Sequence, residues 1–146
     1  MKTILLINGP NLNLLGTRQP EIYGCETLEE IVQKLKIISM QHDFLLNDYQ
    51  NNVEGNIVSF LNEAYIAKNT SGIIINPAAY SHTSIAIRDA LEMFVNVPIY
   101  EVHLSNIFAR ESFRHHSFVS PIATGVISGL GSFGYIAALQ KILEIK

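Results

Sequence analysis

A glutamate and a histidine lie two positions apart, as Glu101 and His103, in an apolar stretch of the second half of the chain. Side chains two positions apart on an extended strand point to the same face of the sheet, so the carboxylate can contact the imidazole ring. Such a contact fixes the tautomer of the imidazole and favours its protonated form. The pair therefore predicts a poised general acid, with a half-buried structural ion pair as the alternative.

A tyrosine and an arginine, Tyr23 and Arg18, lie in a long segment near the N-terminus, residues 8–25. A connection between a strand and the following helix usually has about two to six residues. The part of this segment between Gly16 and Gly24 indicates a lid that closes over a ligand, and a plain surface insertion is the alternative. A phenol has a pKa of about 10 and acts as a base near neutral pH only where a cation stabilises the phenolate. Arg18 can supply that cation.

The segment from Asn76 to Ser84 is also polar and contains His82. A helix that starts just after His82 would direct backbone N–H groups and side-chain donors at one point, which suits an anion or a hydroxyl-rich ligand. A histidine with a purely structural role is the alternative.

The arginines are distributed differently from most of the lysines, which lie on predicted helices as solvated charges usually do. Arg18, Arg110 and Arg114 all fall near the predicted carboxyl ends of strands. Arginine makes forked hydrogen bonds with carboxylates and hydroxyl groups, so this clustering predicts a small, polar, anionic substrate. Arg88 is the exception, because its spacing to Glu92 fits a pair on a helix surface.

Two further motifs resemble ligand sites without their full context. Residues 129–134 have the G-x-G-x-x-G spacing, but the acidic ribose ligand that a dinucleotide site places about 20 residues later is missing. We expect these glycines to allow close packing of a helix on the sheet. No carboxylate or thiol at ligand-like spacing accompanies His115 and His116, so we expect no metal site there.

Apolar runs bounded by turn residues alternate with segments of helical period, which predicts a parallel sheet covered by helices. Thr27 and Glu30 form a capping box at the start of the first helix, and another helix should follow Thr83. Residues 106–114 have room for only a short helix. The predicted strands are Thr3–Ile7, Phe44–Tyr49, Gly72–Ile75, Pro98–Val102 and Ala123–Ile127. The apolar helix faces are Leu28, Ile31, Val32, Leu35 and Ile38; Ile57, Val58, Leu61, Ala64 and Tyr65; Ile87, Ala90, Leu91 and Phe94; and Tyr135, Ile136, Leu139, Ile142 and Leu143.

Right-handed crossovers between these units give an α/β fold, a flavodoxin-like doubly wound five-stranded parallel sheet of order 2-1-3-4-5. A ligand crevice is expected at the carboxyl ends of the first and third strands, where the winding direction switches, with the fourth strand beside them. The chain has 146 residues, so residues 1–146 should form a single catalytic domain.

The composition excludes several classes of protein. Hydrophobic residues make up 48% of the chain and charged residues 16%, so the chain can bury a sizeable core. A net charge of −3 offers no field for a nucleic acid or an anionic membrane surface, and the first apolar run is too short for a signal peptide or a membrane span. With Cys25 as the only cysteine, a reducing cytoplasm is expected.

These residues resemble one family closely, the type II 3-dehydroquinate dehydratases, over essentially the whole chain. The segments that carry the resemblance are Asn8-Gly9-Pro10-Asn11-Leu12-Asn13, Gly16 to Gly24 with Arg18, Pro20 and Tyr23, Asn76 to Ser84, Glu101 to Asn106, Ala109-Arg110-Glu111, and Phe113-Arg114-His115-His116-Ser117. The resemblance implies cofactor-free dehydration of 3-dehydroquinate to 3-dehydroshikimate through an enolate, a step of the shikimate route to aromatic amino acids.

The resemblance also implies a role for each site residue. Tyr23 would remove the proton with Arg18 lowering its pKa, a water near Asn13 would meet the enolate charge, and His103, oriented by Glu101, would protonate the departing hydroxyl. Asn76, Ser105 and the backbone of Leu104 would bind the substrate carboxylate. His82 and Arg114 would contact the ring hydroxyls.

A second implication of the resemblance concerns the assembly, a dodecamer of four trimers in which Asp89 enters the site of a neighbouring subunit. The alternative function is a flavodoxin-like domain that binds a phosphate or nucleotide without catalysis. Such a domain would place acidic residues after the first strand, where this sequence has Asn8, Asn11 and Asn13.

Overall fold

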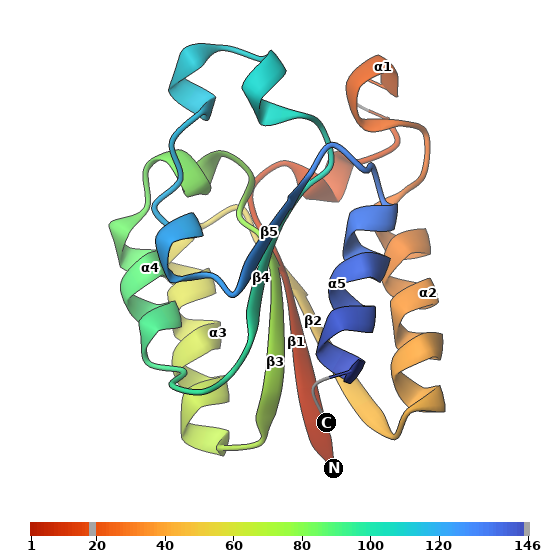
Figure 1. Cartoon of the computed structure of the whole chain (residues 1–146), viewed down its shortest axis with the longest axis vertical. Coiled ribbons are helices and arrows are strands. Elements are labelled where there is room, and N and C mark those ends of the chain that lie inside the picture. The colour runs from red at the N-terminus through yellow and green to blue at the C-terminus, as the bar shows by residue number, and fades with distance from the viewer. Residues whose placement is uncertain (18–19, 145–146) are drawn as a thin grey trace.

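A single sheet of five parallel strands forms the centre of the molecule, in the order β2-β1-β3-β4-β5 (Figure 1). The computed structural model describes residues 1–17 and 20–144, and it describes only the backbone of residues 22 and 23. The strands are β1 (Lys2–Asn8), β2 (Phe44–Gln50), β3 (Thr70–Asn76), β4 (Ile99–His103) and β5 (Gly125–Ser128). The order confirms the prediction, and every predicted strand is present with its ends at most two residues from the predicted ones.

Helices cover both faces of the sheet, as the doubly wound prediction requires. Figure 1 shows α2 and α5 on one face and α3 and α4 on the other, with the N-terminus and the last turn of α5 at the same end of the molecule. The helices are α1 (Pro20–Tyr23), α2 (Leu28–Gln41), α3 (Glu54–Ala67), α4 (Ile85–Glu92) and α5 (Phe133–Glu144). None of the described helices is long and apolar enough to cross a membrane.

The sheet separates two apolar clusters because neighbouring strand residues point to opposite faces. Ile4 and Leu6 pack towards α2 and α5, while Leu5 and Ile7 pack towards α3 and α4. All four side chains are at most 1% exposed. The central strands β1, β3 and β4 are therefore buried on both faces, which is typical of a parallel sheet, while the edge strands β2 and β5 are partly exposed.

The predicted cap of α2 is confirmed, since the Thr27 hydroxyl accepts the backbone N–H of Glu30 at 3.2 Å. It also donates to the Glu30 carboxylate at 3.1 Å, so the two side chains bond each other directly. This pair satisfies one of the free N–H groups at the helix start and places a negative charge near its positive end.

The start of α4 was predicted too early. Residues 78–82 form a 3-10 helix, and the N-cap of α4 is Ser84, whose hydroxyl accepts the Ile87 N–H at 2.9 Å. His82 is therefore the last residue of a short 3-10 helix and not the residue before an α-helix, so the expected convergence of α-helical N–H groups is absent there.

Two smaller differences concern Tyr65 and the segment after β4. Tyr65 is 47% exposed and packs edge-on against Phe94 at a ring distance of 5.8 Å, so it belongs to the rim of its helix and not to the buried face. The segment after β4 contains two 3-10 helices, Ile107–Ala109 and Ser112–Arg114, and not one short helix.

Candidate functional site

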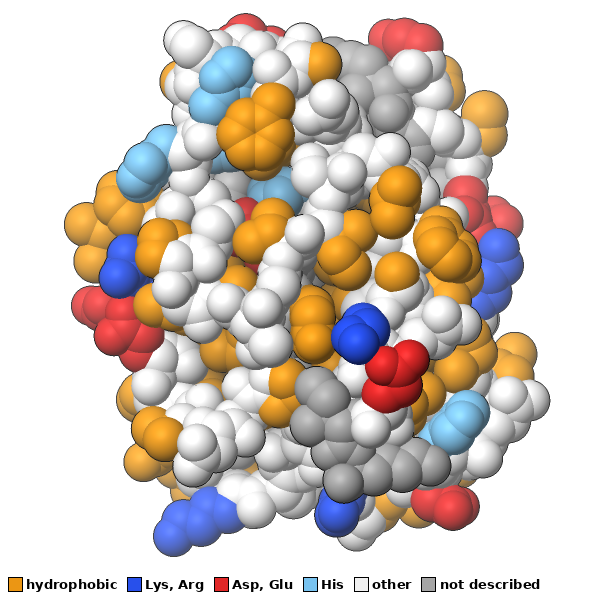
Figure 2. All heavy atoms as spheres, viewed as in Figure 1, with side chains coloured by type: hydrophobic (Ala, Val, Ile, Leu, Met, Phe, Trp, Pro, Cys, Tyr) orange, Lys and Arg blue, Asp and Glu red, His pale blue; other side chains and the backbone are white. Residues whose placement is uncertain are grey.

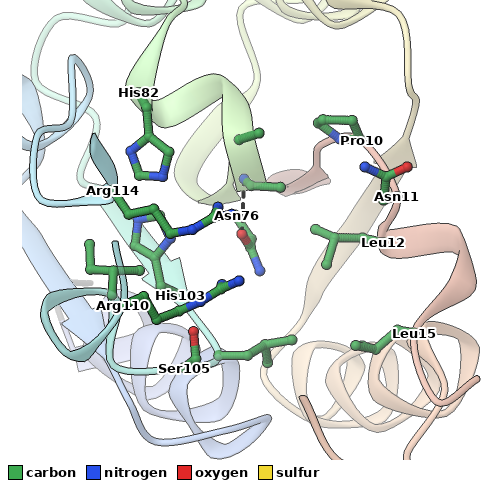
Figure 3. Close-up of a pocket in the computed structure, with 14 residues that line it drawn as sticks. Pro10, Asn11, Leu12, Leu15, Asn76, His82, His103, Ser105, Arg110 and Arg114 are labelled. Carbon is green, nitrogen blue, oxygen red and sulfur yellow. Dashed lines mark hydrogen bonds between the residues drawn. The ribbon is translucent and has the colours of Figure 1, made fainter. Parts of the chain in front are cut away.

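A pocket of about 150 Å³ opens at the carboxyl ends of β1, β3 and β4, where the strand order predicted a crevice. Figure 3 shows Asn76 near its centre, with His103, Arg110 and Arg114 on one side and Leu12 and Leu15 on the other. The residues that line it are Pro10, Asn11, Leu12, Leu15, Asn76, Ala78, Ala79, His82, His103, Leu104, Ser105, Ile107, Arg110 and Arg114. The apolar and cationic walls face each other across a space suited to one small polar molecule.

The predicted pair at the end of β4 is present. His103 Nε2 forms a short hydrogen bond with Glu101 Oε2. Glu101 is fully buried and His103 is 5% exposed, and only His103 reaches the pocket lining. Because Nε2 is bound to the carboxylate, Nδ1 is the ring nitrogen left to exchange a proton with a ligand.

Two serines from the segment after the 3-10 helix at 112–114 complete the surroundings of Glu101. Ser117 donates its hydroxyl to Oε2 at 2.9 Å, and Ser120 donates to Oε1 at 2.6 Å. Burial raises the pKa of Glu101, but hydrogen bonds from His103, Ser120 and Ser117 outweigh it and hold the pKa below its ordinary value. The buried glutamate is therefore an anion at neutral pH.

A neutral network supports the other side of the pocket. The Tyr135 hydroxyl on α5 donates to Asn8 Oδ1 at 2.6 Å and accepts from Asn76 Nδ2 at 2.9 Å. Asn76 Oδ1 in turn accepts the backbone N–H of Ala78 at 3.1 Å. Tyr135 is fully buried, and burial raises its pKa far above the ordinary value, so it stays a neutral phenol. These bonds fix the amide of Asn76 at the pocket wall.

The backbone beside Asn76 is unusually close to its neighbours. Ala78 has a φ of 52°, a left-handed conformation that alanine rarely adopts. A side chain on Gly9 would place its Cβ 2.3 Å from the carbonyl oxygen of Pro77, so only glycine fits between β1 and the 78–82 turn. The Gly9 N–H donates to the Asn76 carbonyl at 2.8 Å, which extends the pairing of β1 and β3 to the pocket edge.

His82 contributes an imidazole that is largely neutral. Its Nδ1 donates to the backbone carbonyl of His116 at 2.9 Å, so Nε2, which lies 3.5 Å from the Ser81 hydroxyl, is the unprotonated nitrogen of the neutral ring. Burial lowers the pKa of His82, and the nearby His103 and Arg114 lower it further. The rings of His82 and His103 lie nearly parallel with centroids 6.5 Å apart. Figure 2 shows histidine side chains gathered at this end of the molecule.

Arg110 and Arg114 supply the positive charge of the pocket wall. Arg114 Nε donates to Glu111 at 2.8 Å and its side chain is 24% exposed, so the guanidinium is anchored at its edge. A guanidinium held this way can still offer its terminal N–H groups to an anion. The charge of the wall matches the anionic substrate predicted from the arginine clustering.

The predicted site residues differ in whether they line the pocket. The pocket lining brings together His103, Asn76, His82, Leu104, Ser105 and Arg114. Glu101 lies behind His103. Asn13 and Asp89 are both exposed and do not line the pocket of this subunit. Arg18 and the side chain of Tyr23 lie outside the described residues, and the backbone of Tyr23 ends α1.

Three contributors were missed from the sequence: the hydroxyls of Tyr135, Ser117 and Ser120. Tyr135 was assigned to the apolar face of its helix, which is correct for its ring. The sequence signal for the two serines was their position, since Ser117 and Ser120 follow His115 and His116 closely in a loop.

The remaining motifs have structural explanations. The glycine-rich turn docks on the site strand, because Gly129 and Gly131 donate their N–H groups to the carbonyls of His103 and Leu104 at 3.2 and 2.9 Å. A Cβ on Gly134 would lie 3.1 Å from Val102, so this glycine allows α5 to approach the sheet. His115 Nε2 donates to the Arg110 carbonyl at 3.1 Å. Within residues 1–17 and 20–144, no group of three or more metal-ligating side chains is found.

Comparisons with known proteins agree on one family. Residues 2–143 match the family model described as dehydroquinase class II. The chain is 57% identical over 141 residues to the 3-dehydroquinate dehydratase of Buchnera aphidicola subsp. Cinara cedri, covering 97% of this chain and 91% of that protein. It is 50% identical over 143 residues to 3-dehydroquinate dehydratase 2 of Pseudomonas aeruginosa, covering 98% and 95%. The crystal structure of type II dehydroquinase from Butyrivibrio crossotus superposes with a TM-score of 0.92 at 45% identity, covering 97% of each chain.

Proposed function

Because this chain belongs to the class II dehydroquinase family, we propose that it catalyses the dehydration of 3-dehydroquinate to 3-dehydroshikimate in the shikimate pathway. The observation that carries the proposal is the buried Glu101–His103 pair, which opens through His103 into a pocket with a cationic wall. A dehydration that removes a hydroxyl from an anionic substrate needs both a proton donor and a positively charged binding site.

The reaction divides into two proton transfers. Tyr23, as a phenolate stabilised by Arg18, removes the proton next to the substrate ketone and forms an enolate. A water held near Asn13 stabilises the negative charge on the enolate oxygen. His103 then gives a proton to the departing hydroxyl, and Glu101 stabilises the imidazolium that supplies it. Water leaves and the conjugated enone remains.

Binding is assigned to the residues around the pocket. Asn76, Ser105 and the backbone N–H of Leu104 hold the substrate carboxylate, and His82 and Arg114 contact the ring hydroxyls. The fixed amide of Asn76 and the available Nε2 of His82 support these roles. The cationic Arg110 lies on the same wall and adds to the attraction of an anion.

The alternative of a flavodoxin-like domain that binds a phosphate or nucleotide without catalysis is not favoured. The matches to dehydroquinases cover nearly the whole chain and not the sheet alone. We place the enzyme in the cytoplasm, in keeping with its single cysteine, and as one catalytic domain over residues 1–146.

The test is an ultraviolet assay, because the product is a conjugated enone and the substrate is not. Purified protein should generate the enone absorbance from 3-dehydroquinate, and His103→Ala should lose most of this activity and regain part of it with added imidazole. Tyr23→Phe should bind a substrate-like ligand while turning over poorly, since it keeps the ring and removes the base. An inactive wild-type protein would refute the function, and full activity of either variant would remove that residue from the mechanism.

The proposed assembly is a dodecamer of four trimers, in which Asp89 of one subunit completes the site of another. The exposed position of Asp89 on α4, away from the pocket of its own subunit, supports this role. Tyr23→Phe and Asp89→Ala chains should each be nearly inactive alone and regain part of the activity when they are unfolded together and co-assembled. No recovery in confirmed mixed oligomers, or a fully active isolated monomer, would refute the shared site.

A further inference from the structure

The carboxylate of Glu101 is held by two hydroxyl groups in addition to His103. Ser120 donates to Oε1 at 2.6 Å, and Ser117 donates to Oε2 at 2.9 Å, the oxygen that also bonds His103 Nε2. Both oxygens of a fully buried carboxylate are therefore occupied. A buried charge requires hydrogen-bond partners for its oxygens, and the same partners also influence where the proton shared with His103 lies.

The direction of the Ser117 hydroxyl is fixed by the backbone. Ser117 Oγ accepts the N–H groups of Val119 at 3.1 Å and of Ser120 at 3.2 Å. A hydroxyl has one hydrogen and two acceptor positions, so both acceptor positions of Ser117 are used. Its hydrogen can only be donated, and it points at Glu101 Oε2. A proton on Oε2 would weaken this bond, because the O–H oxygen of a neutral carboxyl group accepts hydrogen bonds less well than a carboxylate oxygen.

We infer that Ser117 and Ser120 are positioning residues for the reaction, because their two donated hydrogen bonds stabilise the ionised carboxylate of Glu101 and so keep the proton of the pair on His103 Nε2. The tautomer of His103 is then decided before substrate arrives, and Nδ1 is always the nitrogen that faces proton exchange. For its kinetic consequence the inference rests on the proposed dehydratase function.

The charges around the pair act in addition to the serines. Arg114 approaches from the 3-10 helix at 112–114 and brings a positive charge to the pocket wall, and the largely neutral His82 approaches from the 3-10 helix at 78–82. Arg110 lines the same pocket wall. These groups are unchanged in the serine variants, so a comparison of variants isolates the hydroxyl donors.

The experiment uses Ser120→Ala and Ser120→Thr as its central pair, since the threonine keeps the hydroxyl. Ser117→Ala and the double variant follow, and the control is Ser112→Ala, at an exposed serine of the preceding 3-10 helix. Removing one hydrogen bond to a buried charge should lower kcat of Ser120→Ala about tenfold with KM changed less than about twofold. Ser120→Thr should recover most of kcat, and Ser112→Ala should behave as wild type.

The second readout is the 15N NMR signature of the His103 ring, recorded without substrate. The wild-type protein should show only the Nε2–H tautomer of neutral His103, and the double variant should show a mixture of tautomers. An unchanged tautomer together with unchanged kcat in the double variant would refute the inference. Ser117→Ala can fail to fold, because the turn at 117–120 loses its acceptor. In that case kcat and the His103 tautomer of Ser120→Ala decide whether the inference holds. A wild-type protein without dehydratase activity would refute the proposed function, whereas the NMR result would still decide the tautomer.

Discussion

Tyr135→Phe tests whether the neutral network under the pocket holds the fold together. The substitution keeps the buried aromatic ring and removes one oxygen atom. That oxygen joins Asn8 of β1 and Asn76 of β3 through bonds of 2.6 and 2.9 Å. Asn8 is 1% exposed and Asn76 is 3% exposed, so water has little access to the groups that lose their partner.

The cost follows from the number of polar groups left without a partner. A buried neutral donor or acceptor that loses its hydrogen bond costs about 1–3 kcal/mol. Two such groups remain, an amide oxygen on Asn8 and an amide N–H on Asn76, while the missing oxygen leaves almost no cavity. We expect the free energy of unfolding to fall by about 2–6 kcal/mol, which corresponds to a fall in Tm of about 6–20 °C for a chain of this size.

Tyr100→Phe is the matched control. Tyr100 is 7% exposed and belongs to the same apolar cluster as Tyr135, but among the described residues its hydroxyl forms no hydrogen bond. Unfolding of both variants is followed by circular dichroism, because the chain has no tryptophan, and at equal protein concentration, because association shifts the apparent stability. A Tyr135→Phe variant that loses no more stability than Tyr100→Phe would refute the reasoning.

Two further predictions concern backbone space and pH. In Gly9→Ala the added Cβ would lie 2.3 Å from the Pro77 carbonyl oxygen. The free energy of unfolding measured in urea should therefore fall by more than about 2 kcal/mol, which is in the upper part of the usual range for overpacking. Gly55→Ala, with open space around it in the first turn of α3, should instead be neutral or stabilise by up to about 1 kcal/mol, and equal effects would contradict the clash. Glu101→Gln should change the acid stability profile. Because the folded pKa of Glu101 lies below its ordinary value of 4.5, the contribution of this carboxylate to wild-type stability is fully present above pH 4.5 and is lost as the pH falls through the folded pKa. The free energy of unfolding of Glu101→Gln should therefore fall less steeply with decreasing pH than that of the wild type. If the two proteins lose stability in parallel from pH 5 downwards, the prediction is wrong.

The fold could be predicted because the three central strands, β1, β3 and β4, are short apolar runs buried on both faces. Runs such as Ile4 to Ile7 and Ile73 to Ile75 are completely or almost completely buried, and right-handed crossovers then leave few possible orders. The start of α4 was less predictable. Thr83 and Ser84 are both good N-cap residues, and the choice between them depends on the 3-10 turn before them.

The candidate site was predictable only where its residues lie at strand ends. His103 and Asn76 fall at the carboxyl ends of β4 and β3, so the topology alone brings them together. The bond from Tyr135 to Asn8 joins residues 127 positions apart, and no local pattern distinguishes this hydroxyl from that of an ordinary core tyrosine. Ser117 is likewise recognisable as a donor to Glu101 only when the loop is seen folded over the strand.

The two polar networks behind the pocket differ in what they can do chemically. The network of Tyr135, Asn8 and Asn76 is neutral, and burial raises the pKa of Tyr135 so far that no proton leaves it at ordinary pH. The network of Glu101 and His103 carries a charge and ends in an imidazole that reaches the pocket. The first can therefore fix the position of a bound molecule, and only the second can exchange a proton with it. Under the proposed function, Tyr135→Phe should raise KM more than it lowers kcat and Ser120→Ala should do the opposite, and identical kinetic changes in the two variants would contradict this division.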